Sequence, residues 1–205
     1  MDSSFNHDPT KNGWLGLVFA NGHWELARAR IRIEGGSSST DSYDGYEKIM
    51  ITSSLRDSPD DFPFLYCPTL SPGRVDTASV LIHGRKVKLD RNALLNQNFQ
   101  LNRDSRVNRN SRLQIRFHGR RYDLVLIAGG NVVIRGDGKQ SIFGTLEAQD
   151  ASARLIWAGD IDRDGALDLL VEFEDQDGGG DCLLTSGGAT GRELVHQAGC
   201  EMIAG

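Results

Sequence analysis

The sequence predicts an all-β protein, built either as an antiparallel, meander-rich sandwich or as an open barrel. Glycine is abundant and proline scarce, with 24 Gly and 5 Pro in 205 residues, which favours many short strands joined by tight turns. Apolar runs of about four to seven residues alternate with Gly-containing turns, most clearly from Leu113 onward. Residues 91–101, around Ala93-Leu94-Leu95, are the best place for a short helix. We therefore expect about ten to thirteen strands and almost no helix.

The N-terminal part reads as a hairpin followed by a long polar loop. The apolar run 14–19 leads into Asn21-Gly22, a dipeptide suited to a type I′ turn, and strand-like sequence resumes at Trp24. Apolar and basic residues alternate over 28–33, which predicts a strand with one solvated face. Residues 35–47 are rich in Ser, Gly, Asp and Tyr and predict a loop within one domain, because strand-like sequence begins again at Lys48.

The C-terminal half predicts a β-meander and then a strand pair around an acidic loop. The meander strands are separated by turns at His118-Gly119, Gly129-Gly130-Asn131 and Gly136-Asp137-Gly138. The strand pair consists of ARLIWAG and ALDLLVEFE, and DCLLTS and RELVHQ are further candidate strands. We expect residues 1–12 to be disordered and residues 13–205 to form a single all-β domain, with a calcium-binding hairpin at 155–173.

Composition and the N-terminal residues bear on the compartment. No apolar run approaches the roughly 20 residues that a membrane helix needs, so no membrane span is expected. The start, MDSSFNHDPTKNGW, is not a secretory signal peptide. The three cysteines are too few for a disulfide scaffold and lack C-x-x-C spacing. Two arrangements stay open: a Cys182–Cys200 bridge that leaves Cys67 free, or buried free thiols.

Charge is distributed unevenly along the chain. The formal net charge is -5, yet the segment 85–121 contains eleven Lys or Arg and two acids. Within this segment four arginines recur at every third residue. They are Arg103, Arg106, Arg109 and Arg112. This segment is a candidate for binding an acidic partner or a nucleic acid, although a solvated loop explains it as well and aromatic side chains for base stacking are few.

The acidic loop after Trp157 carries the clearest chemical signal. It follows the pattern D-x-D-x-D-G-x-x-D, in which alternate carboxylates on a curled loop converge on one centre. Calcium prefers six to eight such hard oxygen ligands. Gly165 permits the sharp turn. The candidate ligands are the side chains of Asp160, Asp162, Asp164 and Asp168 and the carbonyl of Ala166.

The spacing of these aspartates distinguishes between two known kinds of calcium loop. An EF-hand needs Glu at its twelfth position, where this chain has Val171, and it needs flanking helices. The nine-residue form between two strands instead resembles the calcium-binding loop of FG-GAP repeats, found in integrin-alpha-type β-propellers and in bacterial secreted proteins. The resemblance covers 155–173 and implies the same four Asp side chains and the Ala166 carbonyl as ligands. A propeller needs several such repeats and the sequence contains one, so a full propeller is not expected.

These observations favour binding over catalysis. The sequence contains no G-x-S-x-G elbow, P-loop or strand-linked G-x-G-x-x-G, so no catalytic residues are assigned. We expect a calcium-stabilised β module that acts in the periplasm or outside the cell by binding another protein, for example as an inhibitor or immunity protein of a secreted toxin. One alternative is a hydrolase or glycan-acting enzyme with its site near 175–181. The other is nucleic-acid or acidic-partner binding through 85–121.

Overall fold

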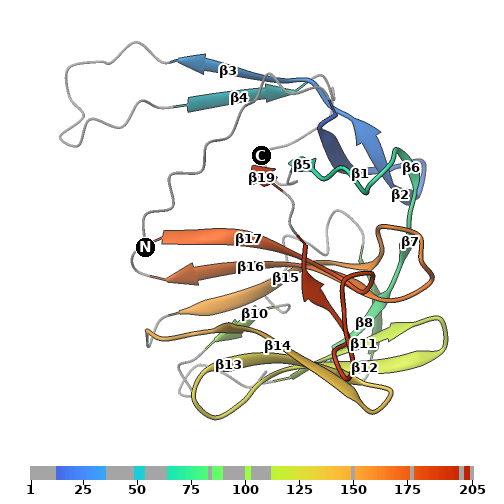
Figure 1. Cartoon of the computed structure of the whole chain (residues 1–205), viewed down its shortest axis with the longest axis vertical. Helices are drawn as coiled ribbons and strands as arrows, with labels where there is room; N and C mark the ends of the chain where they lie inside the picture. The colour runs from blue at the N-terminus through green and yellow to red at the C-terminus, as the bar shows by residue number, and fades with distance from the viewer. Residues whose placement is uncertain are drawn as a thin grey trace. The chain divides into compact units, whose positions relative to one another are not determined.

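The computed structural model is built from antiparallel β-strands (Figure 1). It describes residues 13–35, 49–53, 64–82, 85–89, 100–102, 112–148, 151–175, 178–198 and 201–203. No sheet within these ranges closes into a barrel, so the predicted all-β sandwich class is confirmed. The same ranges contain no helix with the length and apolarity that a membrane span requires.

The chain divides into two compact units, which are described separately. Unit 1 comprises Met1–Val18, Leu26–Gly73 and Cys200–Gly205, and unit 2 comprises Phe19–Glu25 and Arg74–Gly199. Unit 2 contains the acidic loop and the predicted meander.

Unit 1 holds most of a five-stranded sheet and a separate strand pair. The sheet order is β19 (Glu201–Ile203), β5 (Phe64–Tyr66), β1 (Leu15–Ala20), β2 (His23–Arg28) and β6 (Gly73–Arg74). The pair is formed by β3 (Ile31–Gly35) and β4 (Ile49–Ser53). A small core joins Trp14, Ala29 and Phe64, with Tyr66 against it, and the Ala29 amide donates to the Trp14 carbonyl at 2.9 Å.

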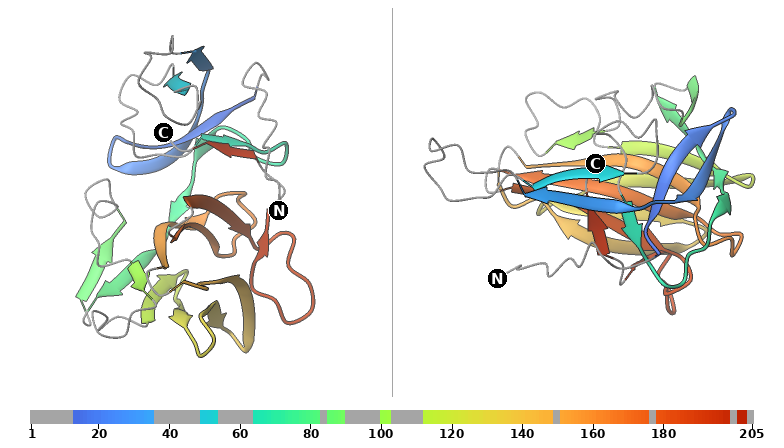
Figure 2. Two further views of the ribbon diagram at one scale, coloured as in Figure 1. Left: turned by 90° about the vertical axis from the view of Figure 1, so that its left-hand side faces the viewer. Right: turned by 90° about the horizontal axis from the view of Figure 1, so that it is seen from above.

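Unit 2 is a sandwich of two six-stranded sheets (Figures 1 and 2). The first contains β10 (Gln100–Asn102), β15 (Ser152–Asp160), β16 (Asp168–Asp175), β17 (Gly178–Thr185) and β18 (His196–Gln197) in that order, and β7 (Asp76–Thr77) pairs with β15. The second contains β14 (Lys139–Thr145), β13 (Asn131–Gly136), β12 (Arg120–Leu126), β11 (Arg112–Phe117), β8 (Ser79–Ile82) and β9 (Arg85–Lys88) in that order.

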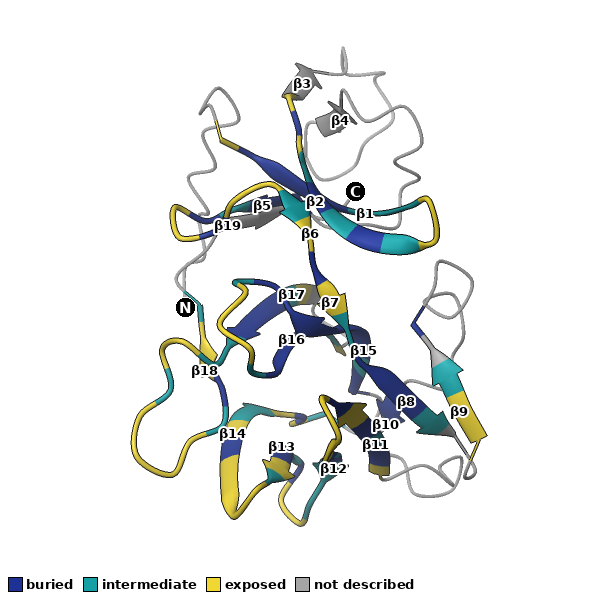
Figure 3. Ribbon diagram, turned by 90° about the vertical axis from the view of Figure 1, so that its right-hand side faces the viewer, coloured by how far each residue is buried: buried dark blue, intermediate teal, exposed yellow. Residues whose placement is uncertain are grey.

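The core of unit 2 lies between these sheets. Ile115, Leu124 and Ile134 of the second sheet share one buried cluster with Leu155 and Leu169 of the first. Figure 3 shows β15 almost wholly buried, as are residues 168–171 of β16, whereas four of the seven residues of β14 are exposed. Burying these apolar side chains lowers the free energy of the folded state, and this determines which face of each strand points inward.

Three of the predicted turns are confirmed and share one two-residue conformation; the turn predicted at Gly136-Asp137-Gly138 is centred on Asp137-Gly138. Asn21-Gly22, His118-Gly119 and Asp137-Gly138 each have positive φ at both residues, between 45° and 78°. Positive φ at both central positions is the property of the type I′ turn, whose twist matches the twist of the paired strands.

The strand count exceeds the prediction, because the described residues hold nineteen strands. Several extra strands, such as β6, β7 and β18, are only two residues long and depend on pairing with distant segments. Such short pairings leave no periodic sequence pattern. Of the expected helix, residues 91–99 lie outside the described residues, and Gln100 and Leu101 belong to strand β10.

Of the two cysteine arrangements predicted from the sequence, the Cys182–Cys200 bridge is wrong, and the free-thiol arrangement holds for Cys182 but not for Cys67. Cys67 is disulfide-bonded, whereas Cys182 is a buried free thiol on β17. A Cys182–Cys200 bridge is therefore excluded. The chain does return to β17 through β18, whose His196 and Gln197 pair with Thr185 and Leu184, but this pairing does not make Cys182 a disulfide partner.

Candidate metal site

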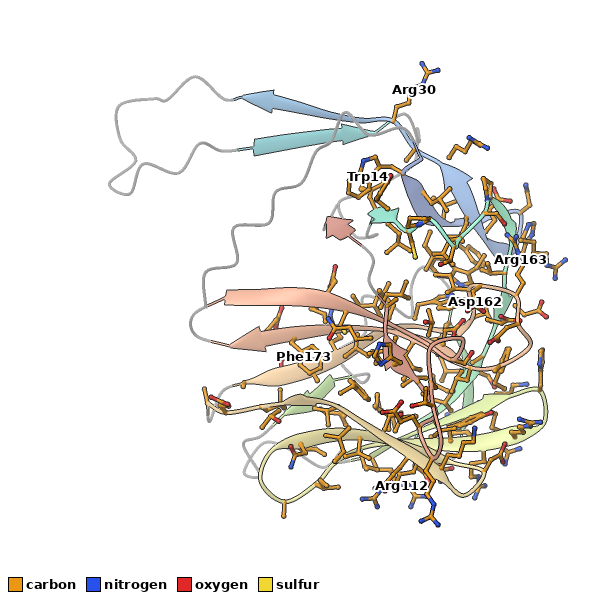
Figure 4. The ribbon with its side chains drawn as sticks, viewed as in Figure 1. Trp14, Arg30, Arg112, Asp162, Arg163 and Phe173 are labelled. Atoms are coloured by element: carbon orange, nitrogen blue, oxygen red, sulfur yellow. The ribbon has the colours of Figure 1, made fainter. Side chains whose placement is uncertain are left out.

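The acidic loop connects the two central strands of the first sheet of unit 2. Strand β15 ends at Asp160, strand β16 begins at Asp168, and Gly159 pairs with Asp168 in the antiparallel register. The first and last aspartates of the motif are therefore held by strand pairing, and the residues between them form the loop. Figure 4 shows Asp162 and Arg163 on this loop.

Three of the four predicted aspartates converge. One carboxylate oxygen from each of Asp160, Asp162 and Asp168 lies within 4.8 Å of the other two. Asp168 is fully buried and Asp160 is 6% exposed. Acidic side chains are almost never this buried unless a partner compensates their charge, so the cluster could hold a metal ion.

Backbone amides satisfy some, but not all, of the carboxylate oxygens. Asp168 accepts hydrogen bonds from the amide of Ile161 at 2.7 Å and from the amide of Ser186 at 2.8 Å. Asp160 Oδ2 accepts from the amide of Gly165 at 2.9 Å. In contrast, Asp160 Oδ1 is buried without a hydrogen-bond partner. A buried unpartnered carboxylate oxygen is costly, and a bound cation would satisfy it.

The other two predicted ligands are placed differently. Asp164 is exposed and lies outside the three-carboxylate cluster. Its Oδ1 accepts from the amide of Ala166 at 2.8 Å, and its Oδ2 accepts from the Ser186 hydroxyl at 2.7 Å. Ala166 is half-buried on the loop between Asp164 and Asp168. Asp164 thus fastens the loop to the turn after β17.

Burial and mutual repulsion favour the protonated forms of two aspartates. Burial raises the pKa of Asp168 to about 7, the charge of Asp162 adds to the increase, and the amide hydrogen bond from Ser186 opposes it. Burial also raises the pKa of Asp162, together with the charges of Asp164 and Asp160. A divalent cation at the cluster would reverse this preference, because opposite charge favours the ionised form.

Apolar anchors and backbone conformation explain why the loop curls. Ile161 and Leu167 are 1% and 4% exposed, and they fix the loop's two ends in apolar surroundings, as their positions between the aspartates predicted. Arg163 and Gly165 adopt left-handed conformations with φ of 66° and 85°. Arg163 is an unusual residue for this region, and its Nε donates to the Arg74 carbonyl at 3.0 Å.

Two residues at the site were missed from the sequence. Ser186 donates to both Asp164 and Asp168, and Gly187 follows it in the turn after β17. A Cβ atom at Gly187 would lie 3.0 Å from Asp162 Oδ2, so a side chain there would make the approach of the turn to the carboxylate tight. The Ser-Gly-Gly run 186–188 after β17 could have indicated both residues, but only if the pairing of β17 with β16 were already known.

The basic candidates are described only in part. Arg103, Arg106 and Arg109 lie outside the described residues. Arg112 begins β11, points away from the first sheet, and pairs with Asp123 through two bonds of 2.9 and 2.7 Å (Figure 4). This arginine is therefore engaged within the molecule.

The acidic segment after β16 does not form a second cluster within the described residues. Asp177 lies outside them, and Asp181 is in the middle of β17, opposite Glu172. Burial raises the pKa of Asp181 to about 6, the charge of Glu172 adds to this, and Arg154 opposes it. Arg154 itself bonds Glu172 at 2.6 Å. Arg154, Glu172 and Asp181 therefore form a row of charged side chains across β15, β16 and β17.

Comparisons with known proteins give no family for this chain. It matches no protein-family model, no curated protein and no solved structure. The similarity of 155–173 to the FG-GAP calcium loop therefore rests on the motif itself.

Proposed function

We propose that this chain is a calcium-stabilised β module that acts outside the cytoplasm by binding another protein. The observation that carries the proposal is the buried cluster of Asp160, Asp162 and Asp168, with its unpartnered Asp160 oxygen.

The donor set supports calcium. The cluster offers carboxylate oxygens and neither imidazole nor thiolate, the ligands that zinc prefers. Asp160, Asp162 and Asp168 would hold the ion, and the Asp164 carboxylate and the Ala166 carbonyl are next to them along the loop. A bound calcium ion would supply positive charge that offsets the repulsion among the carboxylates.

The position of the cluster supports a structural role. Asp160 and Asp168 end and begin adjacent strands, so an ion held by both would tie β15 to β16. Because both side chains are almost wholly buried, little of the ion's surface would be open to a substrate. This arrangement supports a structural role for the ion rather than a catalytic one.

The disulfide at Cys67 supports the compartment. Disulfides form and persist in oxidising environments such as the periplasm and the extracellular space, and they are rare in the cytosol. Millimolar calcium, which weak calcium modules need, is also typical of extracellular settings.

Equilibrium dialysis with radioactive calcium tests the metal site. We expect one ion per chain with a dissociation constant of about 10⁻⁴ to 10⁻³ M and weaker binding of magnesium. Asp162→Asn removes a ligand charge but keeps an oxygen for the hydrogen bond from the Asp164 amide, and it should weaken binding about tenfold or more. Asp76→Asn, which removes an exposed carboxylate outside the cluster, is the matched control and should bind normally. Equal binding by both variants would refute the site.

Affinity capture with the calcium-loaded protein tests the binding role. Recovery of one stoichiometric protein partner, reduced by a chelator, is the expected result. Recovery of no partner by the folded, calcium-loaded chain would refute the proposed function while leaving the metal site intact.

A further inference from the structure

The outer face of the second sheet of unit 2 contains an open hollow with a basic lining. It spans about 690 Å³ across β12, β13 and β14. Its cations are Arg121, Arg135, Lys139 and Arg192, all exposed. We call it the basic hollow. Strand pairing sets Arg135 between Asp123 and Gln140, and a 2.9 Å bond from the Gln140 amide to the Arg192 carbonyl brings Arg192 to the edge.

The acids of the basic hollow are engaged and its cations are not. Asp123 is held by Arg112, and Asp137 lies 3.2 Å from Arg120. Glu193 accepts from the Thr190 amide at 3.1 Å. Across the described part of the chain, the side chains of these four cations form no ion pair or hydrogen bond. Their charge is therefore uncompensated within this part of the molecule.

The neighbouring strand increases this positive charge. Arg116 lies directly opposite Arg121 across β11 and β12, and like charges in this position repel. Within the described ranges Arg116 also has no ion pair. A negatively charged partner would relieve the repulsion, because opposite charges on facing surfaces attract and guide association.

The side chains on this face fit a protein rather than a nucleic acid. The aromatic residues of these strands do not lie on the face, since Phe117 and Tyr122 are buried and Phe143 packs against the core. Bases would find no ring on which to stack. Ile142, 59% exposed, is the one large apolar side chain exposed within the described residues, and its position two residues from Gln140 places it on the same face. An apolar side chain beside unpaired arginines matches an acidic protein segment that carries an apolar residue.

We infer that the basic hollow is the surface with which this chain docks a carboxylate-rich segment of its protein partner. Arg121, Arg135 and Arg192 bind the carboxylates, and Ile142 packs against an apolar side chain of the segment. This inference rests on the proposed protein-binding function and names its surface and the chemistry of its partner.

Fluorescence anisotropy with a labelled peptide of Glu-Glu-Leu repeats tests the inference. The wild type should bind this peptide, bind its Gln-for-Glu counterpart at least about tenfold more weakly, and release it as salt is added. The double variant Arg121→Gln/Arg135→Gln should lose about tenfold or more in affinity. The double variant Arg28→Gln/Arg85→Gln removes two exposed arginines elsewhere and should change affinity less than about twofold. Circular dichroism and calcium binding confirm that both variants are folded.

Three results would overturn the inference. They are equal binding by the two double variants, no binding of the acidic peptide by the wild type, and tighter binding of oligothymidylate than of the peptide. Once a partner is identified, its equal capture by the wild type and Arg121→Gln/Arg135→Gln would overturn the docking surface and leave the proposed binding function standing.

Discussion

Replacing Asp160 by Asn separates the metal-free stability of the protein from its response to calcium. Asn keeps an oxygen that can accept from the Gly165 amide, and it places an amide group where the buried, unpartnered Oδ1 now lies. The substitution also removes one charge from a cluster whose oxygens lie within 4.8 Å of one another. At an effective dielectric constant of about 20, two unit charges at this distance repel by about 3 kcal/mol. Metal-free Asp160→Asn should therefore be as stable as the wild type or more stable.

The calcium response should change in the opposite direction. For a dissociation constant of about 10⁻⁴ to 10⁻³ M, roughly 10 mM calcium stabilises the wild type by about 1.4 to 2.7 kcal/mol. This corresponds to an increase in Tm of about 3 to 11 °C for a protein of this size. In Asp160→Asn we expect an increase of no more than about 1 °C.

Thermal melts by circular dichroism, with calcium or with EDTA, measure both quantities. Asp76→Asn should retain the full calcium response, because Asp76 is exposed and outside the cluster. Two results would show that Asp160 does not bind calcium as proposed: a calcium response of Asp160→Asn equal to that of the wild type, or a metal-free variant markedly less stable than the metal-free wild type.

Four further predictions concern pH, charge and packing. The pKa of Asp168 is raised to about 7 from an ordinary value of 3.8, so Asp168 must lose its proton before calcium can bind. The calcium affinity measured by dialysis should therefore fall about tenfold from pH 8 to pH 6. For the same reason, between about pH 4 and pH 7 the metal-free folded protein holds a proton on Asp168 that the unfolded chain has released. The free energy of unfolding of the metal-free protein should therefore decrease as the pH rises over this range. An increase, measured by urea titrations, would contradict the placement of Asp168. Asp181→Asn should stabilise the protein by about 1 kcal/mol at pH 7, after allowance for partial exposure, because it removes a carboxylate that faces Glu172. A loss of stability in urea melts would show instead that the charge of Asp181 stabilises the fold. Gly159→Ala should destabilise by about 3 kcal/mol, since its Cβ would lie 2.1 Å from the Asp76 carbonyl oxygen, and an unchanged Tm would contradict this close approach.

Local patterns predicted the parts of the fold that depend on neighbours in the sequence. The turns at His118-Gly119 and Asp137-Gly138 are confirmed because a two-residue turn with a suitable dipeptide largely determines its own hairpin. The position of the acidic loop between two strands was also predictable, because Ile161 and Leu167 mark the points where the chain enters and leaves an apolar environment.

The features that depend on distant segments were not predictable. The contacts of Ser186 with the aspartates require the pairing of β16 with β17, which no local pattern specifies. The uneven roles of the aspartates have the same cause, because Asp164 bonds Ser186 instead of joining the cluster. The basic hollow likewise forms only when the β12–β14 register brings Arg121 and Arg135 to one face and the segment at Arg192 reaches β14.

A crystal structure of the protein grown with calcium tests the central claim most directly. We expect one cation between β15 and β16, with Asp160 Oδ1 and oxygens of Asp162 and Asp168 at about 2.3 to 2.6 Å from it. A loop that holds only water at saturating calcium, or an ion bound elsewhere while Asp160 Oδ1 stays buried and unligated, would contradict it.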